Sequence, residues 1–326
     1  MKTILAVTCS DEDTTFVPLA KAVEARGGRL LRFDTDRFPH ECQLSGELVP
    51  GTWRGEVVNH LGERVALDAL HAVWWRRMRT GLNMPKEGVP PHVRRAARLE
   101  SEVTLEGLIA SLPIQHVDDP FLVHRAERKA WQFAQATAVG LHIPETWLGN
   151  AGPSALRFAG RQDRLITKGM SLVLIPGPHG NLETMPTSAV GPEELETLPG
   201  DLAWSTACLQ ARVDKTMEVR AVVVGDRVLA AGVDSQQLEV SEVDWREGDF
   251  ALMPQFRRVD LPDALAAKLV ALNRRMGLRY GGADLIRTPE GEWIFLEINP
   301  GGEWGWVQEF AELDVAGTLA DLLLAD

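Results

Sequence analysis

Two apolar runs on either side of a short polar turn occupy residues 281–302, and this stretch constrains the fold more than any other part of the chain. The turn reads Pro289-Glu290-Gly291-Glu292, a composition typical of the end of one strand and the start of the next. The pattern predicts an antiparallel hairpin. If all four turn residues lie in the loop, Thr288 pairs with Trp293.

The same count places Asp284 directly opposite Glu297. Facing like charges destabilise a sheet, and both acids lie in apolar strands where an unpaired charge is costly, so a bound cation would resolve the conflict. Asn299 lies two residues beyond Glu297 and projects from the same face. Oxygen ligands without His or Cys suit Mg²⁺, which also binds water and phosphate. The alternative is a surface hairpin with solvated acids, but the pairing and the apolar flanks favour a metal site.

The N-terminal part of the chain predicts a different architecture. Residues 2–8 are a strand, 16–27 a helix and 29–33 a second strand, which is the βαβ pattern of a parallel sheet. Neither a GxGxxG nor a GxxxxGK[ST] nucleotide loop follows the first strand. At 326 residues the chain is long enough for two or three packed units.

Composition limits the partners and the location. The net charge of −12 and the pI near 5.2 make nucleic acid and anionic membrane poor candidates. The N-terminus lacks the features of a signal peptide, and no stretch has the roughly 20 apolar residues that span a bilayer, so we expect a cytoplasmic protein. Cys9, Cys42 and Cys208 form neither a metal pair nor a disulfide framework, and we expect them to be reduced.

Several segments resemble the ATP-grasp ligases and, within them, the graspetide (microviridin-type) peptide maturases. Asp284 with Glu297-Ile298-Asn299-Pro300 is similar to the magnesium signature of the superfamily. The branch is indicated by these further segments in order: VWWRR, RKAWQFAQATAVGLHIPET, LITKGMSL, VDKTMEVRAVVVGDRV, AGVDSQ, DWR and FLEINPGGEW.

The resemblance implies an α/β (α+β) chain with the ATP-grasp fold. We expect an N-terminal pre-ATP-grasp domain over 1–120, a central subdomain with a peptide-binding hairpin over 121–205, and a C-terminal subdomain with the Mg-ATP site over 206–326. Asp284, Glu297 and Asn299 would bind Mg²⁺.

The resemblance also implies roles in nucleotide binding. Lys129 and Lys168 resemble the lysines that contact ATP phosphates. Gln210, Ala211 and Val213 lie in a segment similar to the linker strand whose backbone binds adenine, although Gln210 stands where the superfamily often has Glu. Glu218 resembles the acid that accepts the ribose hydroxyls.

Two arginines, Arg220 and Arg246, are expected to stabilise the transferring phosphate, because a planar guanidinium can hold two oxygens of a phosphoryl transition state. Arg220 begins an apolar strand, where a purely structural arginine would be unusual. Arg246 lies in a predicted loop, where a simple salt bridge is the alternative.

For this branch the implied substrate is a ribosomally made precursor peptide, with a leader and a core. Its Asp or Glu carboxylates would become acyl phosphates, and Ser/Thr hydroxyls or Lys amines would then close ester or amide rings. The leader is expected near 170–200, and a homodimer is expected. The basic run 76–79 is read either as a peptide-facing or dimer-facing patch or as a solvated strand end. Two alternatives stay open: a ligase that adds a free amino acid, and an inactive ATP-grasp module that only binds.

Overall fold

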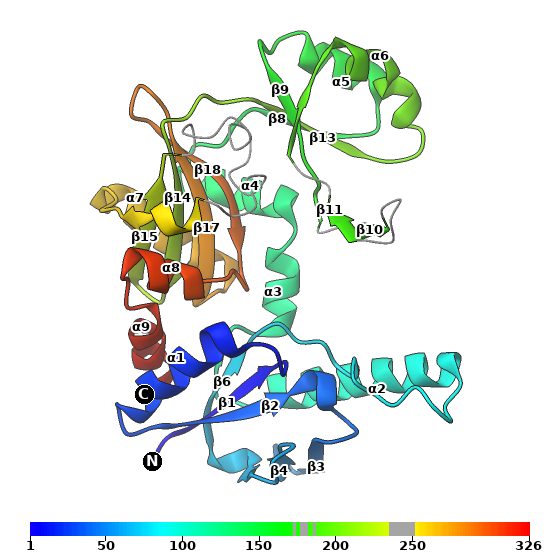
Figure 1. Cartoon of the computed structure of the whole chain (residues 1–326), viewed down its shortest axis with the longest axis vertical. Helices are drawn as coiled ribbons and strands as arrows, with labels where there is room; N and C mark the ends of the chain where they lie inside the picture. Colours follow the sequence, from blue (N-terminus) through cyan, green and yellow to red (C-terminus); the bar gives the residue numbers. More distant parts are fainter. Residues whose placement is uncertain (172–173, 177–181, 185–186, 235–251) are drawn as a thin grey trace.

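A computed structural model of the chain describes residues 1–171, 174–176, 182–184, 187–234 and 252–326. These residues form three main sheets (Figure 1). The sheet nearest the N-terminus lies at one end of the molecule, the sheet formed within residues 146–211 lies at the other end, and the sheet formed within residues 217–299 lies between them.

The N-terminal sheet is parallel and has the order β2-β1-β6-β7. The predicted βαβ unit is confirmed, although its helix begins and ends three residues earlier than expected. The elements of this region are β1 (Thr3–Thr8), α1 (Asp13–Glu24), β2 (Arg29–Asp34), β3 (Gln43–Val49), β4 (Thr52–Val58), β5 (Arg64–Ala66), β6 (Leu70–Trp75), α2 (Pro91–Ala110) and β7 (Gln115–Val117).

The middle sheet is antiparallel and has the order β12-β9-β13-β8. The elements of this region are α3 (Pro120–Ala126), α4 (Lys129–Ala138), β8 (Thr146–Gly149), α5 (Gly152–Ala159), β9 (Leu165–Thr167), β10 (Leu174–Pro176), β11 (Leu182–Thr184), β12 (Ser188–Val190), α6 (Pro192–Asp201) and β13 (Ala207–Ala211). Strand β13 lies in the middle of this sheet, between β9 and β8.

The third sheet has the order β16-β15-β14-β17-β18, and all its strand pairs are antiparallel. Its elements are β14 (Met217–Val224), β15 (Arg227–Val233), β16 (Arg257–Arg258), α7 (Asp263–Met276), β17 (Tyr280–Arg287), β18 (Trp293–Asn299), α8 (Gly305–Ala311) and α9 (Val315–Leu324). The last helix, α9, returns to the N-terminal region and packs against α1 and β6. Both ends of the chain therefore meet, and Lys2 pairs with Asp326 at 2.5 Å.

The segment between the N-terminal and middle sheets forms two helices instead of one continuous helix. Helix α3 ends at Ala126 and α4 begins at Lys129, because Arg128 between them is extended. The Nε2 of Gln132 donates to the carbonyl of Ala126 at 2.7 Å and satisfies a group that a continuous helix would have paired internally. The break turns α4 towards the end of β18.

The hairpin of β17 and β18 confirms the predicted pairing of Asp284 with Glu297, but the turn is shorter than predicted. Thr288 N–H donates to Glu292 O at 2.9 Å, so three residues form the loop, with Gly291 at φ +87°. The pairing of Thr288 with Trp293 is therefore wrong, since Arg287 is opposite Trp293. A bulge at Leu296 adds one residue to β18 and restores the expected register at Asp284.

Candidate functional site

The side chains of Asp284, Glu297 and Asn299 gather where β17 and β18 meet. Asn299 Nδ2 donates to Asp284 Oδ2 at 3.2 Å and lies 3.5 Å from Glu297 Oε1. Glu297 is 8% exposed. The predicted trio is thus brought together on one face, with the amide nitrogen of Asn299 turned towards the two carboxylates.

Protein cations hold both carboxylates. Arg220 on β14 is opposite Asp284, and its Nε lies 2.8 Å from Asp284 Oδ1. Lys129, the first residue of α4, places Nζ 2.8 Å from Glu297 Oε2. The like-charge conflict is therefore relieved by the protein itself, and the repulsion of two isolated acids is not by itself an argument for a metal. Among the residues that the structure describes, no group of three His, Cys, Asp or Glu side chains could hold a metal ion.

Arg220 occupies a narrow slot between two glycines. A Cβ on Gly282 would lie 2.7 Å from Arg220 Nη1, and one on Gly302 would lie 3.0 Å from the same atom. The guanidinium carbon also lies 6.0 Å from the ring centroid of Trp306. Any larger residue at either glycine would move the arginine.

Lys129 and Lys168 approach the site from the middle region of the chain. Lys129 Nζ also donates to the carbonyl of Gly169 at 3.1 Å, which connects the end of β9 to the end of β18. Lys168 places Nζ 5.2 Å from the ring centroid of Phe133 on α4. Burial raises the pKa of the Cys208 thiol, and the charges of both lysines oppose this rise, so both ammonium groups lie near one side chain.

The predicted adenine segment consists of Gln210 and Ala211, the last two residues of β13, and of Val213 beyond the strand. The N–H groups of Ala211 and Arg212 donate to the carbonyls of Glu145 and Arg164, each at 2.9 Å. An adenine contact must therefore use other backbone groups, such as those of Val213. Gln210 is 1% exposed and donates to Thr146 Oγ1 at 2.8 Å, while its Oε1 has no hydrogen-bond partner among the described residues.

Glu218 lies on β14, two residues before Arg220. It is 8% exposed, and its Oε1 lies 2.7 Å from Lys215 Nζ. Glu218, the predicted ribose acid, is thus paired with the buried Lys215, which the sequence analysis did not select. Arg246 lies outside the described residues.

A glutamine that the sequence analysis did not select orders the site. The side chain of Gln132 donates to Ile298 O at 2.7 Å and accepts from Ile298 N–H at 3.1 Å. Ile298 lies between Glu297 and Asn299, so this pair of bonds fixes α4, and with it Lys129, against two of the trio. A polar residue on the buried side of an amphipathic helix was the only signal in the sequence.

Arg76, the first residue of the basic run 76–79, fits neither interpretation of that run. Arg76 is 3% exposed, and its guanidinium contacts the backbone of Gly301 and Gly302. Arg76 is therefore neither solvated nor part of an open basic patch, whereas Arg77 and Arg79 are exposed, so the two interpretations stay predictions for them.

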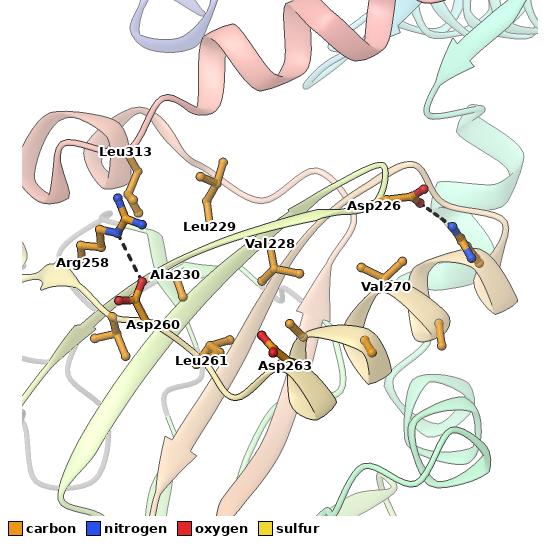
Figure 2. A pocket seen from close by; sticks show the side chains of 15 residues that line it. Asp226, Val228, Leu229, Ala230, Arg258, Asp260, Leu261, Asp263, Val270 and Leu313 are labelled. Carbon is orange, nitrogen blue, oxygen red and sulfur yellow. Dashed lines mark hydrogen bonds and ion pairs between the residues drawn. The ribbon is translucent and has the colours of Figure 1, made fainter.

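Two cavities differ in the residues that line them. One of about 870 Å³ lies between β15 and α7, is lined largely by aliphatic side chains, and contains none of the predicted site residues (Figure 2). The other, of about 590 Å³, is bounded by α2, α3 and the loop after Asn299, where Pro300 and Gly301 form part of its wall. Its acids include Glu106, whose pKa is raised by burial and by the charge of Glu102. The smaller cavity is the one whose wall includes the residues that directly follow Asn299 in the chain.

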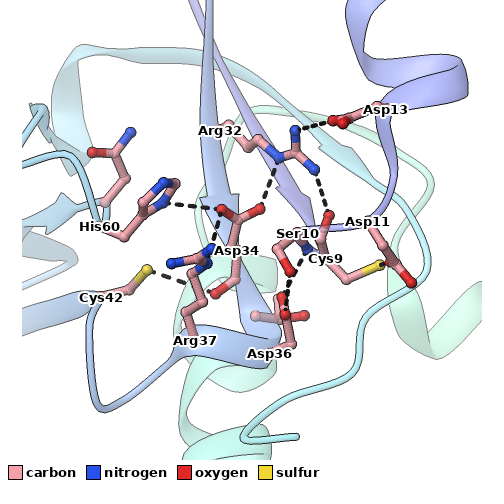
Figure 3. A network of polar contacts seen from close by, with 12 residues as sticks. Cys9, Ser10, Asp11, Asp13, Arg32, Asp34, Asp36, Arg37, Cys42 and His60 are labelled. Carbon is pink, nitrogen blue, oxygen red and sulfur yellow. Dashed lines mark hydrogen bonds and ion pairs between the residues drawn. The ribbon is translucent and has the colours of Figure 1, made fainter. Parts of the chain in front are cut away.

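A second acidic cluster lies at the carboxyl ends of β1 and β2 (Figure 3). Asp34 Oδ1 lies 2.7 Å from Arg32 Nε, and its Oδ2 lies 3.0 Å from His60 Nδ1. Asp36 accepts from the N–H and Oγ of Ser10 and from Asn83 Nδ2. These acids are balanced by close neighbours in the same region of the chain.

The three cysteines are free and buried. Burial, with the bonded Asp11 next, raises the pKa of Cys9 to about 12, and burial raises that of Cys42 to about 11. The expectation of reduced thiols is consistent with these surroundings. No helix among the described residues is long and apolar enough to cross a membrane.

Comparisons with known proteins identify relatives along the chain. The family described as the MvdD pre-ATP grasp domain matches residues 3–124. A RiPP-associated ATP-grasp ligase of Chryseobacterium gregarium, solved with ADP and with a leader and core peptide, is 28% identical, with a TM-score of 0.92 over 99% of this chain and 96% of that one. The macrocyclase MdnC of Microcystis aeruginosa, solved with the precursor peptide MdnA, is 32% identical, with a TM-score of 0.87 over 99% of both chains.

A third similarity is partial. A probable alpha-L-glutamate ligase of Haemophilus ducreyi is 33% identical over 128 residues, which is 36% of this chain. The match spans 39% of the length of that curated relative.

Proposed function

The chain belongs to the graspetide-maturase family of ATP-grasp ligases, and from this membership we propose that it is an ATP-dependent peptide macrocyclase. Its substrate would be a ribosomally made precursor peptide with a leader and a core. It would activate Asp or Glu side chains as acyl phosphates and join them to Ser/Thr hydroxyls or Lys amines.

The observation that carries the proposal is the arrangement around the trio. Two facing carboxylates and an amide lie within reach of two cations from separate elements, Lys129 on α4 and Arg220 on β14. The cations approach the same two strands, and Lys129 also contacts the end of β9. Such a site can accept both a hard cation and the phosphates that accompany it.

The trio fits Mg²⁺ by its chemistry. We propose that Asp284, Glu297 and Asn299 hold the ion, since carboxylate and amide oxygens are the donors it prefers. When bound, Mg²⁺ would neutralise charge on the phosphate oxygens of ATP.

The protein's own cations supply the remaining stabilisation. Lys129 and Arg220, which hold Glu297 and Asp284 in this structure, would transfer their hydrogen bonds to phosphate oxygens. Lys168, the residue that follows β9, would contact phosphate. Gln210, Ala211 and Val213 would adjoin the adenine, and Glu218 would accept from the ribose. Arg246 is proposed as a second arginine for the transferring phosphate.

The reaction then balances in two steps. A substrate carboxylate oxygen forms a bond to the γ-phosphorus of ATP, and ADP leaves. A hydroxyl or amine of the same peptide attacks the acyl carbon, loses its proton, and phosphate leaves. The chain would contribute mainly by positioning and by electrostatic stabilisation.

The cavity of about 590 Å³ gives a peptide room beside the trio, because Pro300 and Gly301 form part of both its wall and the loop after Asn299. We propose that the core peptide enters there and that the leader binds near 170–200. A homodimer is proposed as well, and size-exclusion chromatography with light scattering tests it.

A second candidate is a ligase that adds a free amino acid to a peptide or small molecule. The partial similarity to the probable glutamate ligase favours it, although that match covers only about a third of this chain.

Mass spectrometry separates the two. The purified protein is incubated with ATP, Mg²⁺ and a leader-containing peptide that carries Thr, Lys, Asp and Glu in its core. Macrocyclisation predicts the loss of one water for each ring and one ADP for each water lost. A mass gain that depends on an added free amino acid would instead identify the second candidate.

A further inference from the structure

Arg76, at the end of β6, is a buried arginine to which the proposed reaction gives no role. Its side chain is 2% exposed, although the residue belongs to the N-terminal sheet and the trio belongs to the third sheet. Burying a guanidinium is costly unless all its donors are used. The partners of Arg76 therefore show what the residue holds in place.

These partners lie mostly in the loop that follows Asn299. Nη1 donates to the carbonyls of Gly301 and Gly302, the second at 3.0 Å, and Nη2 lies 2.6 Å from Glu303 Oε2. Within the N-terminal region, Arg76 Nε lies 3.3 Å from Oε1 of Glu12, a residue that is 1% exposed. The guanidinium thus connects the N-terminal region to three consecutive loop residues.

The same loop forms part of the candidate site. Gly302 N–H donates to Asn299 O at 3.0 Å, and a Cβ on Gly302 would lie 3.0 Å from Arg220 Nη1. Tyr280 at the start of β17 donates its hydroxyl to Gly302 O at 2.7 Å. A shift of this loop would therefore move a trio residue and the wall of the Arg220 slot together.

We propose that Arg76 is a positioning residue that, with Tyr280, holds the Gly301–Glu303 loop so that Asn299 and Arg220 keep the geometry needed for phosphoryl transfer. The proposal rests on the proposed function for its kinetic consequence. It assigns to the N-terminal region, which supplies none of the proposed nucleotide contacts, control over the geometry of the Mg-ATP site.

Arg76→Lys tests the proposal, because it keeps the charge but removes the planar fork that reaches several acceptors. We expect kcat for ADP formation to fall roughly 10- to 100-fold, the usual scale for residues that orient ligands. The Mg²⁺ concentration for half-maximal ADP binding, measured by calorimetry, should rise severalfold. The affinity for ADP without Mg²⁺ should stay within about twofold, since the adenine segment belongs to another sheet.

Tyr280→Phe provides a second variant that keeps the buried ring and deletes one bond to the same carbonyl. It should also raise the Mg²⁺ concentration for half-maximal ADP binding while leaving the ADP affinity without Mg²⁺ unchanged, and its loss of kcat should be smaller. This variant decides the question if Arg76→Lys does not fold. Arg79→Lys is the matched control, because Arg79 lies three residues away, is 43% exposed and pairs with Asp11. It should behave as the wild type.

A lower Tm with unchanged kcat and unchanged Mg²⁺ dependence in both variants would show that Arg76 is only a structural brace and would overturn the proposal. If the wild type forms no ADP with any peptide, the proposed function fails instead. The Mg²⁺ dependence of ADP binding still tests the role of Arg76 in that case.

Discussion

Two regions of this molecule bury acidic side chains at the ends of strands, and they balance the charge in different ways. At the end of β2, Asp34 is held by Arg32 on the same strand and by His60, and Asp36 accepts three hydrogen bonds. At the end of β18, two carboxylates face each other and rely on cations from two other elements, α4 and β14.

The difference separates a structural cluster from a chemical one. The partners of Asp34 and Asp36 all belong to the N-terminal region, so these contacts form when that region folds. Cations that arrive from other elements can release their acids when phosphate offers a better anion. The origin of the counter-charge, more than the burial of the acid, distinguishes the candidate site.

The largest expected effect is at the facing carboxylates. Asp284→Asn and Glu297→Gln should each reduce peptide-stimulated ADP release by about 10²- to 10³-fold, the scale for removing one electrostatic contact to a transition state. For Glu297→Gln, Tm should stay within a few degrees, because Lys129 keeps the carbonyl of Gly169 as a partner. Glu292→Gln, an exposed acid on the same hairpin, is the control, and full activity in both site variants would refute the assignment.

At β2 we expect the opposite result, a loss of stability without a loss of turnover. Asp34→Asn leaves Arg32 and His60 facing a neutral group and should cost about 3 kcal/mol of unfolding free energy, as when one partner of a buried pair is removed. ADP release per folded molecule should not change. Urea unfolding and the ADP assay together test this, and a loss of turnover at unchanged stability would erase the contrast between the two regions.

Another buried carboxylate, that of Asp118, accepts N–H bonds from Arg279 and Tyr280 at 2.7 and 2.9 Å. Burial raises its pKa from 3.8 to about 7. The folded state then binds the proton more tightly than the unfolded state, so this stabilising contribution is complete below about pH 4 and is lost as pH rises to about 7.

We therefore expect Asp118→Asn to flatten the decline of Tm between pH 4 and 7, by a few degrees. Thermal unfolding at several pH values measures it. An identical slope in the variant would show that other groups cause the decline.

The smallest effect is expected in the Arg220 slot. Gly302→Ala would bring a Cβ to 3.0 Å from Arg220 Nη1 and 3.1 Å from Asn299 O, and we expect about a tenfold loss of kcat, equivalent to about 1.4 kcal/mol. Gly301→Ala has nothing within 4 Å of its Cβ and should reduce turnover less. Equal losses in the two variants would show that the slot is not the cause.

The sequence pattern was sufficient to predict the hairpin, the βαβ unit at the N-terminus and the proximity of the trio, because each depends on residues close in the chain. The opposition of Asp284 and Glu297 followed from a turn count that was one residue too long, and the bulge at Leu296 compensated for the error. A bulge leaves no signal in a single sequence, since Leu296 fits an apolar strand in either register.

The contacts that organise the site could not be predicted in this way. Gln132 meets Ile298 from 166 residues away, and Arg76 meets Gly302 from 226. Such pairs depend on how three sheets pack, and a lone glutamine or arginine is usually a surface residue. The roles of Lys168, Gln210, Ala211, Val213, Glu218 and Arg246 stay predictions.

The bulge at Leu296 also determines where the chain can accept extra sequence. Residues beyond it, towards the loop at 289–291, pair in one register, while Asp284 and Glu297 pair in another. The second register is fixed independently, by Arg220 opposite Asp284 and by Gln132 on Ile298. An insertion at the hairpin tip can therefore be absorbed before it reaches the carboxylates, which makes this tip the place for an internal tag or a fluorescent peptide.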